Sequence, residues 1–456
     1  MPTISHKIAE FAVNLKYDDL PDEVIYQVKR FLLDSIGCAF GGWDTEDIQI
    51  QHELHKQIGG AAEATVMVSG VRLPVKHAAL LNSLLIRALD YNDIYWEEDP
   101  SHPSDIIPAS LSPAEVEGKS GKEVITAIVL AYEFEQRMCE FAHPGIRERK
   151  WHHATLTGFV SPIVAGKILG LNVEQMVNAI GISGSHCCTL GAVTAGKLTN
   201  MKNTVDPMAV EAGVLAAQLA RAGYTGPEHV IDGKEGLVDA FGPEFELDLL
   251  TKNLGKDWRI LRCSMKAFAA EALTHSPITA VLKIVQDNDL KPEDISQILV
   301  KTVARAADIL SDPSKYKPTS KETADHSLPY CLAAAVVDGM VTPAQFKEEK
   351  LKDPRIWDLL PKIKVVAEPA FEELFPRLKA AEVTITTTED VRHILRVDYP
   401  KGDYRDPMTD EELLDKFDSM VLAKVSQEQR DRMVEAIMNL EGIEDIRDFM
   451  KLMVMG

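Results

Sequence analysis

The 456-residue chain lacks several features that mark well-known protein classes. Its six cysteines form no Cys-x-x-Cys pair, so their spacing signals neither a zinc site nor a cysteine-ligated iron–sulfur cluster. Basic residues are in the minority, with 49 Lys and Arg against 70 Asp and Glu, which gives a formal net charge of −21. A surface this acidic argues against nucleic acid and against an anionic membrane as partners.

Long apolar segments and targeting signals are also missing. No uninterrupted apolar run reaches about 18 residues, so we expect no membrane-spanning helix. The first residues, MPTISHKIAEFAVNL, lack the basic and apolar regions of a secretory signal. Most cysteines fall in apolar segments, as buried thiols do in a reducing compartment. We therefore expect a cytoplasmic protein, in which an anionic substrate would need a local cationic pocket.

What is present is typical of a large globular protein. Hydrophobic residues make up 45% and charged residues 26% of the chain. The length fits roughly two to three domains at about 150 residues each. The first part of the chain is rich in amphipathic or wholly apolar segments of helical length. They predict helices over residues 5–15, 21–40, 75–90, 121–142, 155–170, 173–183 and 207–222.

The sequence pattern changes near Cys263. Strand-like alternation appears in ISQILVKTV and IKVVAEP, and AEVTITTTEDVRHILRV predicts a hairpin that turns at Glu389-Asp390. A smaller hairpin is predicted earlier, around Ser69-Gly70. From about residue 398 the chain is helical again. We therefore predict a mainly α fold: a large all-helical domain of residues 1–263 and 398–456, with an inserted smaller α+β domain of residues 264–397.

The stretch from Arg87 to Pro108, RALDYNDIYWEEDPSHPSDIIP, places polar side chains behind a strongly apolar segment. A buried helix that ends in a polar loop brings proton-transfer groups to the mouth of a pocket, although a capped helix end has the same pattern. Asp90 and Asp93 are three residues apart, so on a continuing helical turn they share a face. Two close carboxylates raise the pKa of one of them, which suits acid–base chemistry. His102 can act as base, acid or carboxylate ligand.

A series of motifs runs in order along almost the whole chain. They are DSIGCAFGG, ALDYND with HPSD, KWHHATLTG, AGKLTNMKN with GYTGP, MKAFAAEALTH, DHSLPYCLAAAVVDG and YPKGDYRDPMTDEEL. In this order they resemble the MmgE/PrpD family, which includes 2-methylcitrate dehydratase, cis-aconitate decarboxylase and iminodisuccinate epimerase. The resemblance implies that the α+β domain is a lid, that the protein is a homodimer without metal or organic cofactor, and that a small polycarboxylate binds between the domains.

The resemblance also implies catalytic residues. Removing a proton next to a carboxylate builds negative charge, so such an enzyme needs a base, an acid and nearby cations. Asp90 and His102 match active-site positions of the family, and Asp93 falls in the same motif. Tyr330 matches a family tyrosine whose phenol can donate a proton, although a core tyrosine with a satisfied hydroxyl is the alternative.

The expected substrate-binding groups are mostly cationic. Two lysines that reach the substrate from different domains would clamp its carboxylates and couple binding to lid closure. The binding residues that we expect are Lys197, Lys266, His275, His153 and Arg87. Lys202 competes with Lys197 for the same role.

Three further clusters leave alternatives open. Asp90, Asp93 and His102 can be combined into a metal site, but such residue types meet often by chance and we predict no metal. His152 and His153 are neighbours, and adjacent residues on a helix point apart, so we expect at most one of them to face a given pocket. The run GISGSHCCTLG has no identifiable base for a thiol nucleophile.

Two positions depart from the family pattern. Glu271 stands where decarboxylase-like members carry a histidine, and Ile94 stands where many members have threonine. The first departure lowers the case for decarboxylation. The motif YNDIYW followed by HPSD resembles the dehydratase branch of the family. We therefore expect a cofactor-independent hydro-lyase that dehydrates a tricarboxylate of the 2-methylcitrate or citrate type. The alternatives are a cis-aconitate-type decarboxylase and an iminodisuccinate-type epimerase.

Overall fold

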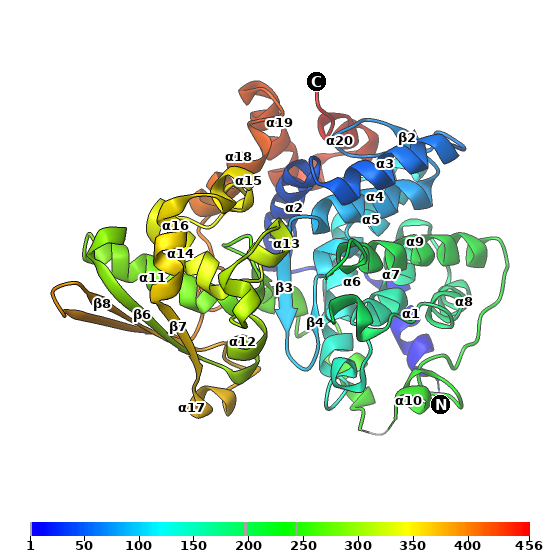
Figure 1. Ribbon diagram of the computed structural model, residues 1–456. Helices are drawn as coiled ribbons and strands as arrows, with labels where there is room; N and C mark the ends of the chain where they lie inside the picture. The colour runs from blue at the N-terminus through cyan, green and yellow to red at the C-terminus, as the bar shows by residue number, and fades with distance from the viewer. Residues whose placement is uncertain (1, 196–197, 243) are drawn as a thin grey trace. The chain divides into compact units, whose positions relative to one another are not determined.

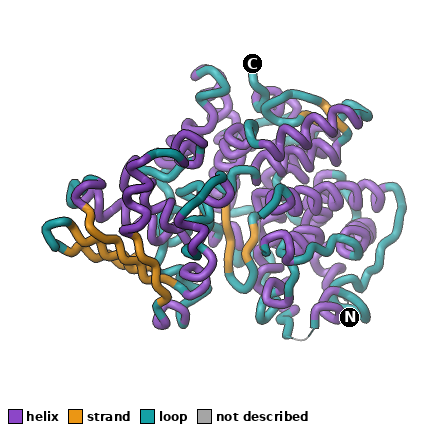
Figure 2. The backbone as a smooth tube through the Cα atoms, viewed as in Figure 1, coloured by secondary structure: helices purple, strands orange, loops and turns teal. Residues whose placement is uncertain are grey.

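The computed structural model describes residues 2–195, 198–242 and 244–456. It contains a helical unit, made of the residues up to Cys263 together with Asp410–Gly456, and an α+β unit, Ser264–Thr409 (Figure 1). Helices dominate the described residues (Figure 2), so the prediction of a mainly α protein is confirmed. Residues 398–409, expected in the helical domain, lie in the α+β unit. The role of that unit as a lid stays a prediction.

Local sequence sets where the helices of the helical unit begin. α6 (Gly121–Glu140) starts at a capping box, in which Ser120 and Glu123 each accept a hydrogen bond from the other's backbone N–H. α7 (Ala154–Ile168) is apolar on nearly every face and buried along nearly its whole length. The other helices of this unit are α1 (Ile4–Asn14), α2 (Asp22–Gly42), α3 (Glu46–Ile58), α4 (Val75–Arg87), α5 (Pro108–Glu117), α8 (Val173–Gly184), α9 (Met201–Arg221), α10 (Leu237–Phe241), α18 (Asp410–Val421), α19 (Gln427–Met438) and α20 (Ile446–Leu452). None of the helices in the described part of the chain is long and apolar enough to cross a bilayer.

α9 is the central helix of this unit, because α4, α7 and α8 all pack against it. The contact with α7 is close, since a Cβ added at Gly213 would lie 2.4 Å from the Cβ of Ser161. α9 begins at Met201 and not at Pro207 as predicted. Burial of Thr204, Val205 and Asp206 against the neighbouring helices stabilises the first turns, although Pro207 removes one backbone donor.

The polar stretch is a short hairpin that follows a helix end. α4 ends at Arg87 and not at Asp90, because Asp90 has a φ of 53°, a left-handed conformation in which the helix cannot continue. β3 (Asp93–Trp96) then pairs antiparallel with β4 (Pro100–Ser101). A 3-10 turn, η2 (Pro103–Ile106), leads into α5.

The C-terminal helices of the unit hold this hairpin in place. α18 packs against α2, and its buried Lys416 lies with Nζ 2.5 Å from Oδ1 of Asp34 on α2. The same ammonium group donates a hydrogen bond of 2.7 Å to the carbonyl oxygen of Tyr91. Burial raises the pKa of Asp34, and the charge of Lys416 opposes that rise. The start of the polar stretch is therefore fixed by a charge pair between the two ends of the chain.

A four-stranded sheet in the order β7-β6-β8-β9 forms the α+β unit's frame. β6 (Ile295–Thr302) is parallel to β7 (Ile363–Ala367) and antiparallel to β8 (Ala381–Thr387), which forms a hairpin with β9 (Arg392–Val397). α11 (His275–Asp287) packs against β8, β9 and α14 (Leu328–Asp338) (Figure 1). The remaining elements of this unit are β5 (Ser264–Met265), α12 (Ala304–Ile309), α13 (Lys321–Ala324), α15 (Glu348–Leu351), α16 (Pro354–Leu359) and α17 (Pro369–Glu372).

Both predicted hairpins are present. β8 and β9 pair in register around the turn, where Asp390 has a φ of 63°. In the helical unit, β1 (Ala64–Thr65) pairs with β2 (Arg72–Leu73), and Gly70 between them has a φ of 70°. A positive φ is the conformation that Gly, Asn and Asp adopt most readily, and it makes these tight reversals possible.

We expect Lys416→Met to lower the free energy of unfolding by about 3–5 kcal/mol, because it leaves a buried carboxylate without its cation. Chemical denaturation followed by circular dichroism measures the change. The matched control is Lys424→Met, which removes a pair with Asp44, whose side chain is 75% exposed. That change should cost below about 1 kcal/mol. Equal losses for the two variants would contradict the structural role given to Lys416.

Candidate active site

The imidazole of His102 is held by the backbone of β3. Its Nδ1 lies 2.6 Å from the carbonyl oxygen of Asp93, and His102 is only 7% exposed. A carbonyl oxygen can only accept a hydrogen bond, so Nδ1 carries the proton. In the neutral ring Nε2 is then the nitrogen without a proton, which is the form that a general base needs.

The carboxylate of Asp93 fixes the turn that follows His102. Its Oδ1 accepts a 2.6 Å hydrogen bond from the hydroxyl of Ser104, and its Oδ2 accepts one of 3.0 Å from the Ser104 backbone N–H. Burial raises the pKa of Asp93 to about 7, although the hydrogen bonds from Ser104 oppose the rise. Asp93 therefore positions His102 in two ways: its carbonyl oxygen accepts from the imidazole, and its carboxylate holds the turn that follows.

Asp90 and Asp93 do not share a helical face, so that prediction is wrong. Asp90 lies beyond the end of α4 in a left-handed conformation, and Asp93 begins a strand. Their carboxylates have different partners. Asp90 pairs through Oδ1 with Arg87, and its Oδ2 lies 3.1 Å from Nζ of Lys202. Asp90 is thus a carboxylate clamped between two cations.

Arg87 is a buried guanidinium surrounded by acids. Besides Asp90, its Nε lies 3.5 Å from Oδ2 of Asp105. Burial alone would lower the pKa of Arg87, but Asp90, Asp105 and Asp206 raise it above its ordinary value. Burial raises the pKa of Asp105 well above its ordinary value, against the opposing charge of Arg87. Asn92 completes the group by donating to Oδ1 of Asp105 at 2.9 Å.

His152 and His153 converge, contrary to the expectation that at most one of them faces a given place. Their ring centroids lie 3.9 Å apart, and the ring of His153 is 5.8 Å from that of His102. The reason is that both residues precede α7, so helical geometry does not spread them. Nε2 of His153 lies 3.4 Å from Oδ2 of Asp206 on α9. The backbone N–H of Ala154 donates to Nδ1 of His152 at 3.2 Å.

The sequence did not point to Asp206. Burial would raise the pKa of this carboxyl, but His153, His152 and Arg87 hold it below its ordinary value. Lys202 and Asp206 are four residues apart on α9 and therefore share a face. That spacing is visible in the sequence. The helix predicted to start at Pro207, however, places Lys202 and Asp206 in the loop before it.

Three predicted site residues belong to the α+β unit. Lys266 is buried. His275 begins α11, and its Nε2 donates a 3.1 Å hydrogen bond to the carbonyl oxygen of Ala270. The hydroxyl of Tyr330, fully buried on α14, donates to the carbonyl oxygen of Gln345 at 2.7 Å, as a core tyrosine does. Lys197 lies outside the described residues.

Two other groups have structural roles. Glu271 accepts a 2.7 Å hydrogen bond from the backbone N–H of Leu273 and so caps a 3-10 turn. Cys187 lies with Sγ 3.9 Å from Nε2 of His186, but burial raises the pKa of the thiol. A raised pKa keeps the thiol protonated, which agrees with a packed helix end rather than a nucleophile.

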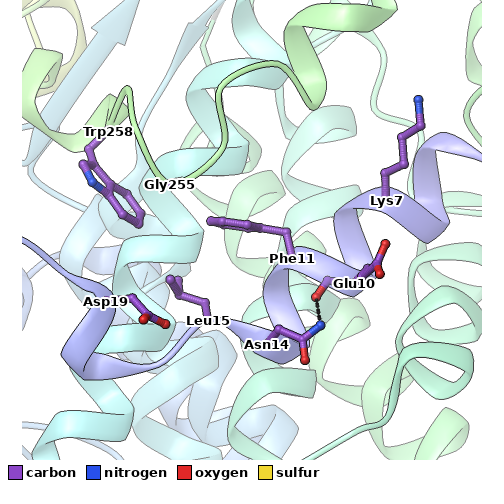
Figure 3. Close-up of a pocket in the computed structure, with 8 residues that line it drawn as sticks. All are labelled: Lys7, Glu10, Phe11, Asn14, Leu15, Asp19, Gly255 and Trp258. Carbon is purple, nitrogen blue, oxygen red and sulfur yellow. Dashed lines mark hydrogen bonds between the residues drawn. The ribbon is translucent and has the colours of Figure 1, made fainter.

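A surface pocket of about 390 Å³ lies elsewhere in the helical unit. Figure 3 shows Phe11 and Trp258 at its wall, with Lys7 and Glu10 on α1 beside them. None of its lining residues belongs to the Arg87, Asp90, Asp93, His102 and His153 group. The candidate site residues and this pocket are therefore separate features of the described structure.

Two family models cover most of the chain. The model of the MmgE/PrpD N-terminal domain matches residues 6–250, and that of the MmgE/PrpD C-terminal domain matches residues 268–441. The chain therefore belongs to the MmgE/PrpD family, as its ordered motifs predict.

Full-length relatives include enzymes of two different reactions. The chain is 26% identical over 480 residues to cis-aconitate decarboxylase of Aspergillus terreus, with 99% of this chain and 96% of the relative covered. It is 26% identical over 459 residues to cis-aconitate decarboxylase of Homo sapiens, with 98% and 93% covered. It is 23% identical over 476 residues to 2-methylcitrate dehydratase of Escherichia coli, with 98% and 96% covered.

The raised pKa of Asp93 predicts a specific pH dependence of stability. Between about pH 4 and 7 the folded protein holds a proton on Asp93 that the unfolded chain has lost, so this carboxyl makes folding less favourable as pH rises. Asparagine stays neutral throughout. Relative to Asp93→Asn, the wild-type free energy of unfolding should therefore fall by roughly 2–3 kcal/mol from pH 5 to pH 7.

Asp445→Asn is the control for this titration, because Arg447 lowers the pKa of Asp445 to about 2 and no histidine contributes to that shift. Its ionised form contributes stability that is present above about pH 4 and is lost at lower pH. Denaturation curves at several pH values should therefore show a constant difference between wild type and Asp445→Asn from pH 5 to pH 7. A constant difference for Asp93→Asn as well would contradict the raised pKa.

Proposed function

We propose that this protein is a hydro-lyase that dehydrates a small tricarboxylate of the 2-methylcitrate or citrate type. One observation carries the proposal: two imidazoles, those of His102 and His153, lie with their ring centroids 5.8 Å apart, and the partner of His153, Asp206, is on the same helix as Lys202. Elimination of water needs a base for the proton on carbon and an acid for the leaving hydroxide. The relatives named 2-methylcitrate dehydratase support the substrate class.

The roles follow from the protonation states. Nε2 of His102 is the acceptor for the proton on the carbon next to a carboxylate, because Nδ1 is held by the carbonyl of Asp93. His153 is the proposed acid that protonates the leaving hydroxide. Tyr330 is less suited to that role, since its proton is donated to Gln345. Lys202 is the proposed carboxylate ligand within the helical unit, with Lys197 as its competitor. Lys266 and His275 stay predictions from the family resemblance.

Decarboxylation of cis-aconitate is the second candidate, because the relatives named cis-aconitate decarboxylase are 26% identical to this chain over nearly its whole length. Glu271 is the observation against it. Its carboxylate caps a backbone turn at the position where decarboxylase-like members carry a histidine. Epimerisation of iminodisuccinate is a further alternative on the same scaffold.

The proposed assembly is a homodimer. Apolar side chains are exposed at regular spacing on two helices of the helical unit: Ile50, Leu54 and Ile58 on α3, and Met201, Met208 and Leu215 on α9. Rows of this kind suit burial against a second copy of the chain.

An NMR panel in deuterated buffer distinguishes the reactions. The purified protein is incubated separately with 2-methylcitrate, citrate, cis-aconitate and iminodisuccinate. We expect loss of water from 2-methylcitrate or citrate. Release of carbon dioxide from cis-aconitate would replace the proposal with decarboxylation, and deuterium uptake into iminodisuccinate without elimination would replace it with epimerisation. No change in any substrate would contradict all three assignments.

Substitutions test the assigned residues. His102→Ala and Asp90→Asn should each lower kcat by at least about 100-fold, because they remove the base and the carboxylate that aligns Lys202. His77→Gln is the control, since His77 on α4 lies beside Glu211, with Nδ1 3.0 Å from Oε1, outside the site. Its activity should stay within about twofold of wild type. Near-normal turnover of both site variants would show that the catalytic groups lie elsewhere.

A further inference from the structure

Three buried side chains behind His153 come from three different helices of the helical unit. Glu135 lies on α6, Thr157 on α7 and Asp206 on α9, which are labelled in Figure 1. All three are at most 2% exposed. Oγ1 of Thr157 lies 2.9 Å from Oε1 of Glu135 and 3.1 Å from Oδ1 of Asp206. We call these three residues the Thr157 bridge.

The two contacts of Thr157 require a proton on one of the carboxyl groups. A hydroxyl has a single hydrogen, so it makes one well-formed donation. If Thr157 donates to one carboxylate, the other carboxyl group must donate to Thr157 and must therefore be protonated. The alternative is two buried carboxylates sharing one hydrogen, which is costly because a buried charge needs a partner.

The surroundings decide which carboxyl group holds the proton. Asp206 faces His153, His152 and Arg87, and these groups hold its pKa low against the effect of burial. Within the described part of the chain, Glu135 has no cation as a partner, and Asp206 and Asp93 are the charges near it. Burial first, and then the charge of Asp206, raise the pKa of Glu135 well above its ordinary value. Glu135 is the neutral end of the bridge and Asp206 the ionised end.

We propose that Glu135 is a permanently protonated carboxylic acid that donates to Thr157, that Thr157 donates to Asp206, and that Asp206 is a positioning residue for the active-site His153. An ionised carboxylate 3.4 Å from Nε2 of His153 keeps a proton on that nitrogen. Nδ1 is then the nitrogen left to exchange protons with a substrate. Fixing the tautomer in this way is how a buried aspartate supports a catalytic histidine.

The part of the proposal that concerns catalysis rests on the proposed function, but the protonation states do not. In the dehydration, His102 takes the proton from carbon, the doubly protonated His153 gives its Nδ1 proton to the departing hydroxide while Nε2 keeps its own, and water leaves. The substrate thus loses one water, and the proton gained by His102 is returned to His153 through solvent. The Thr157 bridge itself exchanges no atoms with the substrate.

The first test detects the proton on Glu135 directly. Infrared spectroscopy at pH 8 measures the carbonyl stretch that only protonated carboxyl groups show. We expect a band in the wild type that Glu135→Gln removes and Asp206→Asn keeps. Glutamine is neutral and nearly the same size, so Glu135→Gln should fold normally. The proposal is overturned if the wild type has no such band, or if Asp206→Asn is the variant that loses it.

The second test reads the tautomer of His153 by ¹⁵N NMR with labelled histidine, assigned with His153→Gln. We expect a proton on Nε2 in the wild type and in Glu135→Gln, and its partial or full transfer to Nδ1 in Asp206→Asn. An unchanged tautomer in Asp206→Asn would overturn the positioning role. If Asp206→Asn does not fold, the wild-type spectrum still decides, because a neutral His153 with its proton on Nδ1 would overturn the positioning role.

The kinetic test separates positioning from substrate binding. Asp206→Asn should lower kcat at least about 10-fold with little change in KM, whereas Glu135→Gln should stay within about threefold. Asp206→Glu, which restores the charge, should recover part of the loss. A change in KM alone would contradict the positioning role. If the protein dehydrates none of the panel substrates, the infrared and NMR results still decide the protonation states.

A further experiment tests whether a metal ion accounts for the closeness of His152, His153 and Asp206. One ligand atom from each of His152, His153 and Asp206 lies within 4.8 Å of the others. The purified protein is stripped with a chelator, incubated with Zn²⁺, dialysed and analysed for metal content. We expect no bound zinc. One equivalent of zinc per chain, lost in Asp206→Asn and kept in His77→Gln, would overturn the proposal, because Asp206 would then be a metal ligand.

Discussion

A buried cation is the constraint on which the candidate site depends. Arg87 ends α4 at a position that is only 3% exposed, where a guanidinium is stable only if acids surround it. Asp90, Asp105 and Asp206 provide that compensation from three separate elements. Because all three acids must face one point, the helix end, the turn before α5 and the first turns of α9 are brought together. His102 and His153 lie at that junction.

The compensation also explains why acids so close together differ in protonation. Asp206 keeps its charge because Arg87 and the two histidines face it, whereas burial raises the pKa of Asp93 to about 7. A single arginine cannot neutralise every carboxyl group around it. The structure therefore contains both ionised and protonated acids within one small volume, and that mixture is what acid–base catalysis requires.

The periodicity of apolar residues predicted most of the helices and strands, and tertiary contacts determined where they begin and end. The two hairpins and most of the helices follow from local alternation and turn residues, which act over short distances. The end of α4 and the start of α9 do not follow from local sequence. α4 ends before Asp90 because Asp90 is left-handed, and α9 begins before Pro207 because the residues around Asp206 are buried. Those errors had consequences for the site. They placed Asp90 and Asp93 on a common face and left Asp206 unnoticed.

Family motifs identified residues that physical reasoning alone would have left as a capped helix end. Asp90 and His102 are examples, since each has a plausible structural role in isolation. Motifs are less informative about contacts: they do not predict that Lys202 lies beside Asp90, as it does among the described residues. The side chain that a residue contacts depends on packing between distant segments, which one sequence does not display.

The Lys416–Asp34 pair has a consequence for the order in which the molecule is made. Asp34 and Tyr91 leave the ribosome more than three hundred residues before Lys416, which contacts both. The nascent helical bundle therefore lacks the Lys416 partner of Asp34 until the whole α+β unit has been synthesised. Contacts this distant in sequence form late and slowly. The start of the polar stretch thus gains its final contacts only near the end of synthesis, and until then the unfinished bundle is the species most exposed to misfolding.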